Sequence, residues 1–281
     1  MTIVDSHFHV WDPAIRDHSW LEVAPPLNQR FSIDQYESVA KANGVERAVL
    51  VQVLNDLAET YEFLTIAANH PIVAGVVGWV DLEAPDVADV IAVLQEARGG
   101  EYLVGVRHLV QSEPDVSYLE RPTVLRGLRA VADASLVFDL LVHVAQMPAA
   151  LNAVRQVENL AVVLDHGGKP QIAGGPREPW SSLVADLAAT GRVDCKVSGL
   201  VTEAGPNWTE AEIRPFIDHL LTVFGSERVL FGSDWPVCTI FASYSDVLAL
   251  VRSCVAELTD GEQAAAMGEN ALRAYGLLRA R

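Results

Sequence analysis

One stretch of the sequence indicates the fold: Val137-Phe138-Asp139-Leu140-Leu141-Val142-His143 and, after an intervening segment, Ala161-Val162-Val163-Leu164-Asp165-His166. Both runs are short and mostly apolar, which is typical of parallel strands that are buried on both faces of a sheet. Between them, Leu151, Val154 and Val157 recur at helical spacing. The stretch therefore predicts two parallel strands joined by a crossover helix.

The same unit recurs along the whole chain. Helix signals between the strands include the capping-box patterns that begin at Ser32 and Thr209. About eight such units predict an α/β protein with a (β/α)₈ TIM barrel as a single domain over residues 1–281. A doubly wound open sheet is the competitor, but no Gly-x-Gly-x-x-Gly turn follows the first strand. The expected strands are 3–9, 46–53, 72–80, 103–108, 137–143, 161–166, 193–199 and 228–234.

Composition narrows the function classes. The formal net charge of −17 argues against nucleic-acid and anionic-membrane partners, because both require clustered Lys and Arg. Cys195, Cys238 and Cys254 are an odd number without a Cys-x-x-Cys pair, which favours reduced thiols. No apolar stretch has the length of a membrane span and the N-terminus lacks a signal-peptide pattern, so we expect a soluble cytoplasmic protein. The oligomeric state stays open, with a homodimer as one option.

Polar residues gather where the predicted strands end. His7 and His9 are one residue apart in an extended segment, so their side chains point to the same face. The carboxyl ends of barrel strands converge on one face, where the active sites of such barrels are built. Residues far apart in the sequence should therefore meet there. The strand-end residues are His7, His9, His108, His143, His166, Lys196 and Asp234.

The chain resembles the amidohydrolase superfamily, and within it the lactonase-like branch (amidohydrolase 2 family) that includes sugar-acid lactonases such as L-fuconolactonase and L-rhamnonolactonase. The matching motifs occur in the family's order over nearly the whole chain. The resemblance implies a (β/α)₈ hydrolase with His7, His9, His143, His166 and Asp234 at the metal and catalytic positions. The motifs are DSHFHVWD from Asp5, GVR from Gly105, DLLVH from Asp139, LDHGGKP from Leu164, KVSGL from Lys196 and FGSDWPV from Phe231.

The metal content is open at this stage. Many superfamily members hold two metals bridged by a modified lysine or a glutamate after the fourth strand, where this chain has Arg107-His108. A binuclear centre is therefore not expected. Two alternatives remain: a single divalent ion, zinc or manganese, or catalysis without a metal. The ligands of a single ion would be His7, His9, His166 and Asp234.

Ester hydrolysis requires a base, positive charge or hydrogen-bond donors for the oxyanion, and an acid for the leaving group. We assign Asp234 as the base that activates water, with His166 and His143 as further catalytic residues. Arg107, His108 and Lys196 are expected to bind the substrate and stabilise charge. Trp11 and Trp235 would offer an apolar wall to a ring, or simply pack under the long loop 11–30, which we expect to cover the site.

Three functions compete on the sequence. The leading hypothesis is hydrolysis of a lactone of a sugar acid or a small carboxylic acid. The alternative is a metal-dependent, non-oxidative decarboxylase of the same superfamily, which uses a similar His-x-His, His and Asp set. The Gly168-Lys169-Pro170 segment and the segment Lys196 to Leu200 favour the lactonase. A barrel that binds a small molecule without catalysis is disfavoured, because Asp234 and the His-x-His pair are both present.

Overall fold

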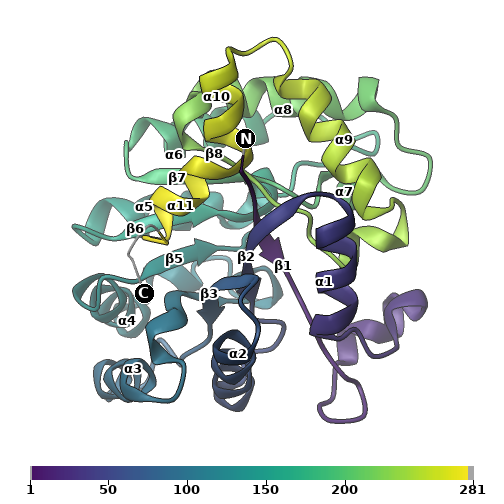
Figure 1. The fold of residues 1–281 in the computed structure, drawn as a ribbon. Coiled ribbons are helices and arrows are strands. Elements are labelled where there is room, and N and C mark those ends of the chain that lie inside the picture. The colour runs from purple at the N-terminus through teal and green to yellow at the C-terminus, as the bar shows by residue number, and fades with distance from the viewer. Residues whose placement is uncertain (1, 278–281) are drawn as a thin grey trace.

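A computed structural model describes residues 2–277 and shows the expected barrel (Figure 1). All neighbouring strands pair in parallel, in sequence order from β1 to β8. Beyond β8 the chain returns to β1, where the amide of Asp234 donates to the carbonyl of His7 at 2.8 Å, so the barrel is nearly closed. The strands are β1 (Ile3–Phe8), β2 (Val45–Val51), β3 (Val73–Gly78), β4 (Leu103–His108), β5 (Val137–Leu140), β6 (Ala161–Leu164), β7 (Val193–Val197) and β8 (Val229–Phe231).

Helices surround the strands on the outside of the barrel (Figure 1). The predicted capping boxes at Ser32 and Thr209 are both formed, at the start of α1 and α8. The helices are α1 (Ile33–Ala42), α2 (Leu57–Asn69), α3 (Val87–Glu96), α4 (Pro122–Asp133), α5 (Met147–Gln156), α6 (Trp180–Ala189), α7 (Leu200–Ala204), α8 (Glu210–Phe224), α9 (Tyr244–Val255), α10 (Asp260–Ala264) and α11 (Asn270–Ala274).

Several strands are shorter than the sequence predicted. The expected strands 137–143, 161–166, 193–199 and 228–234 end three, two, two and three residues early. In three of these cases the chain then enters the left-handed backbone region, at His166 (φ 54°), Gly199 (φ 66°) and Asp234 (φ 57°). That conformation cannot continue a strand. The side chains of His166 and Asp234 therefore come from tight turns above the barrel rather than from the strands themselves.

The other end of the barrel is closed by the last part of the chain. Tyr275 and Leu277 are buried against valines of the inner barrel wall, among them Val49 and Val137. The guanidinium of Arg47 also donates to the carbonyl of Leu277 at 3.1 Å. Access to the barrel interior is therefore left to the end where the strand carboxyl termini lie.

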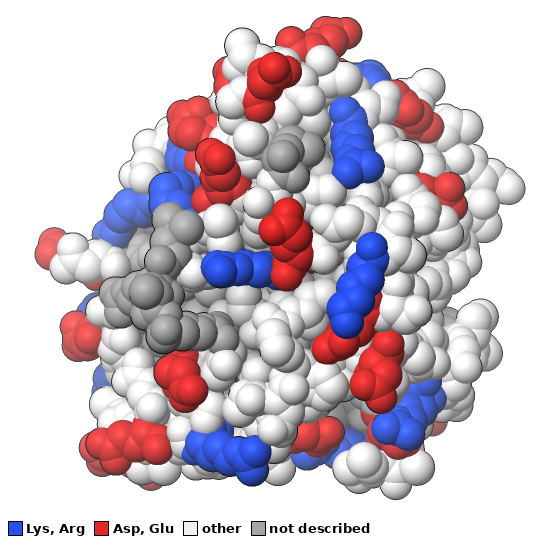
Figure 2. All heavy atoms as spheres, viewed as in Figure 1, with Lys and Arg blue, Asp and Glu red and all other residues white. Residues whose placement is uncertain are grey.

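The surface and the thiols complete the description. No helix within residues 2–277 combines the length and apolar character needed to span a membrane. On the face shown in Figure 2, Lys and Arg side chains lie interspersed with Asp and Glu. Cys195, Cys238 and Cys254 are all free and buried, as the sequence predicted.

Candidate active site

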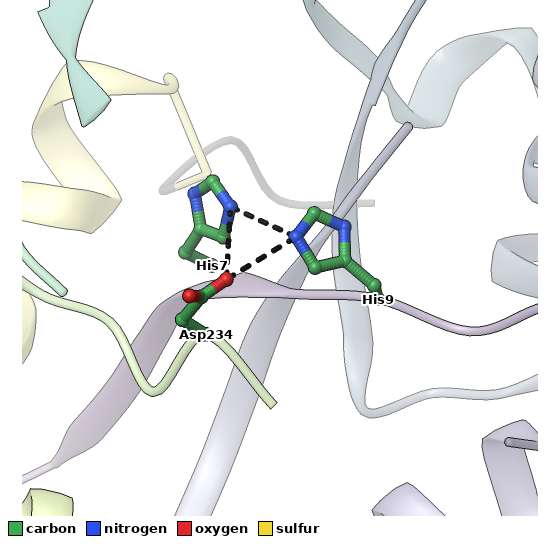
Figure 3. Close-up of side chains that lie close together, drawn as sticks. All are labelled: His7, His9 and Asp234. Carbon is green, nitrogen blue, oxygen red and sulfur yellow. Dashed lines mark hydrogen bonds and ion pairs between the residues drawn. The ribbon is translucent and has the colours of Figure 1, made fainter. Parts of the chain in front are cut away.

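Two histidines and an aspartate converge at the junction of β1 and β8 (Figure 3). His7 lies within β1, His9 follows it, and Asp234 lies in the turn after β8. The Nε2 atoms of His7 and His9 are 3.1 Å apart. Oδ1 of Asp234 lies 3.4 Å from Nε2 of His9 and 3.8 Å from Nε2 of His7. All three side chains are buried, so the group forms one compact set of ligand or proton-transfer atoms.

The backbone fixes Asp234 before any substrate arrives. Its left-handed conformation is uncommon for a residue with a side chain, and such conformations cluster at functional sites. The neighbouring Ser233 holds the turn, because its hydroxyl accepts from the amide of Trp235 at 3.0 Å. Burial alone would raise the pKa of Asp234, but His166 and His9 favour the carboxylate and lower its pKa below the ordinary value. The residue is therefore ionised at neutral pH.

The proton positions on the two histidines are constrained by their outer neighbours. Nδ1 of His9 lies 2.8 Å from the carbonyl of Val51, which only accepts, so Nδ1 carries the proton and Nε2 presents a lone pair. Nδ1 of His7 lies 3.0 Å from Nζ of Lys196 and 3.3 Å from Oδ1 of Asp165. Burial, and then the charge of Lys196, hold the pKa of His7 well below its usual range. His7 is therefore a neutral imidazole.

Two arrangements of the His7 proton satisfy this geometry. With the proton on Nε2, His7 donates to Nε2 of His9, and Lys196 donates to Nδ1. With the proton on Nδ1, His7 donates to Asp165, and its Nε2 lone pair joins those of His9 and Asp234. The second arrangement is the one in which a cation binds, since a ligating histidine usually donates its other N–H to a carboxylate or a carbonyl.

A divalent metal fits the donor set of His7, His9 and Asp234. Two neutral imidazoles and an ionised carboxylate are three protein ligands, which leaves an open position as in catalytic zinc sites. The guanidinium of Arg107 lies 3.3 Å from Nε2 of His7, and its positive charge reduces the affinity for a cation. His166, which the sequence placed in the same ligand set, belongs to a neighbouring group with His7 and Asp165.

His166 lies in the tight turn Asp165–Gly168 after β6. Its Nδ1 lies 2.9 Å from the hydroxyl of Ser198. A Cβ atom at Gly199 would lie only 2.6 Å from that nitrogen, so the glycine is required for the ring to sit there. Burial lowers the pKa of His166 to about 4, so the imidazole is neutral at pH 7.

Lys196 does not face the substrate space, which corrects its predicted role. Its side chain is fully buried, and Nζ lies 2.5 Å from Oδ2 of Asp139 and 2.9 Å from Oδ1 of Asp165. The ammonium group also reaches His7, as described above. The carboxylates of Asp139 and Asp165 hold the ammonium group of Lys196 inside the barrel. From there Lys196 positions His7 and Asp165.

The two buried carboxylates differ although they share one lysine. Burial raises the pKa of Asp139 to about 6, in spite of Lys196 and of the hydroxyl of Tyr275, which donates to it at 2.8 Å. Burial also opposes the charge of Asp165, but Lys196 and His7 hold its pKa well below the ordinary value. Arg107 adds a further ion pair to Asp165 at 2.9 Å. The two cations Lys196 and Arg107 thus balance the two buried carboxylates of Asp139 and Asp165.

Arg107 lines the substrate space, but its hydrogen bonds are directed into the protein. Its guanidinium donates to Asp165, to His7 and to both the carbonyl and the side-chain oxygen of Gln52. The charge of Arg107 therefore acts on the site through the electrostatic field. The paired hydrogen bonds that the sequence assigned to a substrate are made to Gln52 instead.

His108 and His143 stand apart from the cluster. Nε2 of His108 pairs with Glu113 at 2.7 Å, and its ring stacks on Tyr118. His143 is exposed, three residues beyond the end of β5. Its pKa is lowered first by the burial that it retains and then by the charge of Lys169. Neither histidine lines the cavity.

Of the two tryptophans, one offers an apolar wall to the cavity and the other packs against its protein neighbours. Trp11 lines the cavity, whereas Trp235 packs edge-on against Phe31 with ring centroids 5.5 Å apart and does not line it. The loop 11–30 contributes Ser19 and Trp20 to the same wall, so it borders the cavity.

Above the cluster lies a cavity of about 370 Å³, large enough for a monosaccharide-sized molecule. Its floor includes His9, His166 and Asp234. The lining residues are His9, Trp11, Ser19, Trp20, Val53, Leu54, Arg107, Leu109, Gln111, Ser112, Leu141, His166, Lys169, Gly199, Thr202, Glu203, Asp234 and Val237.

Sequence reasoning missed several functional positions. Asp139 and Asp165 stood within quoted motifs without an assigned role, although an acid inside an apolar strand is itself a signal of a buried ion pair. Asp5 was missed too: its carboxylate accepts the amides of His7 and Ser233 and the hydroxyls of two buried tyrosines. Gln111 and Thr202 carry no sequence signal, because only the course of the loops brings them to the cavity.

Comparison with known proteins identifies the class to which this fold and site belong. The family model described as amidohydrolase matches residues 4–277. An L-fucono-1,5-lactonase of Burkholderia ambifaria is 34% identical over 98% of this chain and 96% of its own length. The chain belongs to the amidohydrolase family.

Solved structures of known proteins show the same fold as this chain. An amidohydrolase of Burkholderia multivorans with bound zinc superposes with a TM-score of 0.92, at 32% identity over 98% of this chain and 99% of that one. A 2,6-dihydroxybenzoate decarboxylase superposes with a TM-score of 0.66 at 14% identity over 98% and 99% of the two chains, which shows a common fold alone.

Proposed function

We propose that this chain is a lactonase that opens the internal ester of a sugar acid or a small carboxylic acid. The observation that carries the proposal is the ionised carboxylate of Asp234, fixed at the floor of the cavity beside His9 and His166. The likeness to an L-fucono-1,5-lactonase over nearly the whole chain supports the same reaction.

In this mechanism Asp234 takes a proton from the attacking water as the water approaches the lactone carbonyl. His166 donates its Nε2–H to the oxygen on which negative charge develops, while its Nδ1 accepts from the hydroxyl of Ser198. The positive charge of Arg107 stabilises this developing negative charge electrostatically. The ring oxygen leaves as an alkoxide and takes up the proton that Asp234 received from the water, which gives the open hydroxy acid. The loop 11–30 limits the access of bulk water.

A divalent ion such as zinc or manganese, held by His7, His9 and Asp234, would act as a Lewis acid and lower the pKa of bound water. The zinc-bound relative supports such a site. The measurement is zinc binding by calorimetry, compared between the parent protein and His9→Ala, which removes one ligand. We expect the variant to lose zinc binding; equal binding by the two proteins would place the metal elsewhere.

The central test is a panel of sugar-acid lactones, with and without chelator, applied to the parent and to Asp234→Asn. The amide keeps the shape but not the proton acceptor, so we expect kcat/KM to fall about a hundredfold or more with the fold retained. Asp218→Asn, an exposed position on α8, is the matched control. Near-parent turnover by Asp234→Asn would show that another group is the base.

The decarboxylase alternative is decided by the same panel with aromatic acids added and carbon dioxide measured. A substrate of that reaction presents a carboxylate that a free cation in the cavity would bind. Arg107 and Lys169, the cations among the described lining residues, both pair with protein carboxylates. This pairing favours the lactonase.

A further inference from the structure

Within residues 2–277, two residues that line the cavity each carry a polar atom without a hydrogen-bond partner. Oε1 of Gln111 and Oγ1 of Thr202 are buried without a hydrogen bond, and both residues line the cavity. Buried polar atoms in native proteins are nearly always satisfied, and an exception calls for an explanation. A ligand that hydrogen-bonds to both atoms supplies one.

Both side chains are carried by well-anchored backbone. Gln111 lies in the turn Val110–Ser112 after β4, and its amide donates to the carbonyl of Leu141 at 3.1 Å. Thr202 lies on α7, and its amide donates to the carbonyl of Gly199 at 3.0 Å. The backbone at both positions is therefore fixed before a ligand binds, which favours specific recognition.

The positive charges in the wall are already neutralised by protein carboxylates. Lys169 pairs with Glu203 at 2.8 Å, and both residues line the cavity. Arg107, the other lining cation among the described residues, pairs with Asp165 at 2.9 Å. Among the described lining side chains, a carboxylate or sulfonate on a ligand would thus meet the acids Glu203 and Asp234 and no unpaired Lys or Arg.

We propose that Gln111 and Thr202 bind ring hydroxyls of the substrate and that Glu203, by neutralising Lys169, excludes lactones that carry a second, anionic group. The substrate class is then a neutral polyhydroxy lactone. This inference rests on the lactonase function. The hydrogen-bonding capacity of the two side chains agrees with this substrate class. Oε1 of Gln111 only accepts, whereas the hydroxyl of Thr202 both donates and accepts. Hydroxyl groups therefore satisfy both atoms, whereas a carboxylate does not satisfy Oε1 of Gln111.

The first test uses substrates that differ only at one end, D-glucono-1,4-lactone and D-glucaro-1,4-lactone, with further pairs of aldonolactones and aldarolactones. The two members of each pair exchange a hydroxymethyl group for a carboxylate. We expect kcat/KM to favour the neutral member at least about tenfold. Equal or better turnover of the anionic members overturns the inference, whereas failure to hydrolyse any lactone overturns the proposed function instead.

The second test changes the selectivity through the ion pair. Glu203→Gln leaves Lys169 unpaired, so the ratio of anionic to neutral turnover should rise about tenfold. Lys169→Gln added to that variant should reverse the rise. Glu37→Gln is the matched control, because Glu37 is 20% exposed and pairs with Lys41 at 2.9 Å, much as Glu203 is 21% exposed beside Lys169. An unchanged ratio in Glu203→Gln overturns the proposal.

The third test removes the two hydroxyl contacts. Gln111→Leu and Thr202→Val should each raise KM for neutral lactones about three- to tenfold, with a smaller change in kcat, because one neutral hydrogen bond is lost. Thr222→Val, on the exposed side of α8, is the control for the threonine. Thermal unfolding confirms that each variant is folded. A parental KM in both variants shows that the hydroxyls bind elsewhere.

Discussion

The strand ends of this barrel form two layers with opposite roles. The upper layer, which includes His9, His166 and Asp234, faces the cavity. The lower layer, with Lys196 and Asp139 at its centre, is sealed inside the barrel, where its charges are satisfied by one another. Both layers look alike in the sequence, as polar residues at the end of an apolar run. We propose that a charged strand-end residue positions the site when a protein counter-ion pairs with it, and acts on substrate when none does.

Removing the central cation of the lower layer should give the largest effect. Lys196→Met keeps the length of the side chain but leaves Asp139 and Asp165 without their shared counter-ion. We expect the free energy of unfolding to fall by about 3–5 kcal/mol in urea titrations at pH 7. Lys41→Met, which breaks an exposed pair, should change it by less than about 1 kcal/mol. Equal effects of the two variants would show that the lower layer adds no more than a surface pair.

Glu59 can be compared with the acids of the lower layer, because it is a buried acid that forms no ion pair within residues 2–277. Glu59 is buried and accepts the amides of Val53 and Leu54, and burial raises its pKa to about 7. The folded state therefore binds the proton more tightly than the unfolded state. The stability from this group is complete below about pH 4.5 and is lost as the pH rises through 7, on the order of 3 kcal/mol.

Glu59→Gln removes this titration. Urea unfolding of the parent and of the variant at pH 5 and pH 8 should show that the difference in stability between them shifts in favour of the variant at the higher pH. If the difference is the same at both pH values, the raised pKa of Glu59 is ruled out.

A smaller effect is expected at the contact between the C-terminal segment and the lower layer. Tyr275→Phe removes only the hydroxyl that donates to Asp139. Loss of a hydrogen bond to a buried carboxylate should lower the free energy of unfolding by about 1–3 kcal/mol, while KM for the best lactone stays at the parental value. A changed KM with parental stability would instead make Tyr275 part of substrate binding.

The smallest effect should come from a strand-end residue that belongs to neither layer. His143 is exposed and lies outside the cavity lining. His143→Ala should therefore change kcat/KM by less than about twofold and stability by no more than about 0.5 kcal/mol. A loss comparable to that of Asp234→Asn would restore His143 to the catalytic set that the sequence predicted.

The sequence by itself determined the architecture. Apolar runs and amphipathic helices are local patterns, so eight repeats of them predict the barrel and the face on which its site lies. The convergence of His7, His9 and Asp234 follows from that topology, with the common face of His7 and His9 from strand alternation.

Only the tertiary structure decided which polar residues face the cavity. Lys196 meets Asp139 across 57 residues of sequence, and Tyr275 meets Asp139 across 136. Such pairings depend on the depth of each side chain in the barrel and on turns such as the left-handed one at Asp234. Local sequence patterns predict neither the depth of a side chain nor the conformation of such a turn. Ion pairing and burial depend on the surroundings that the folded chain creates around each group.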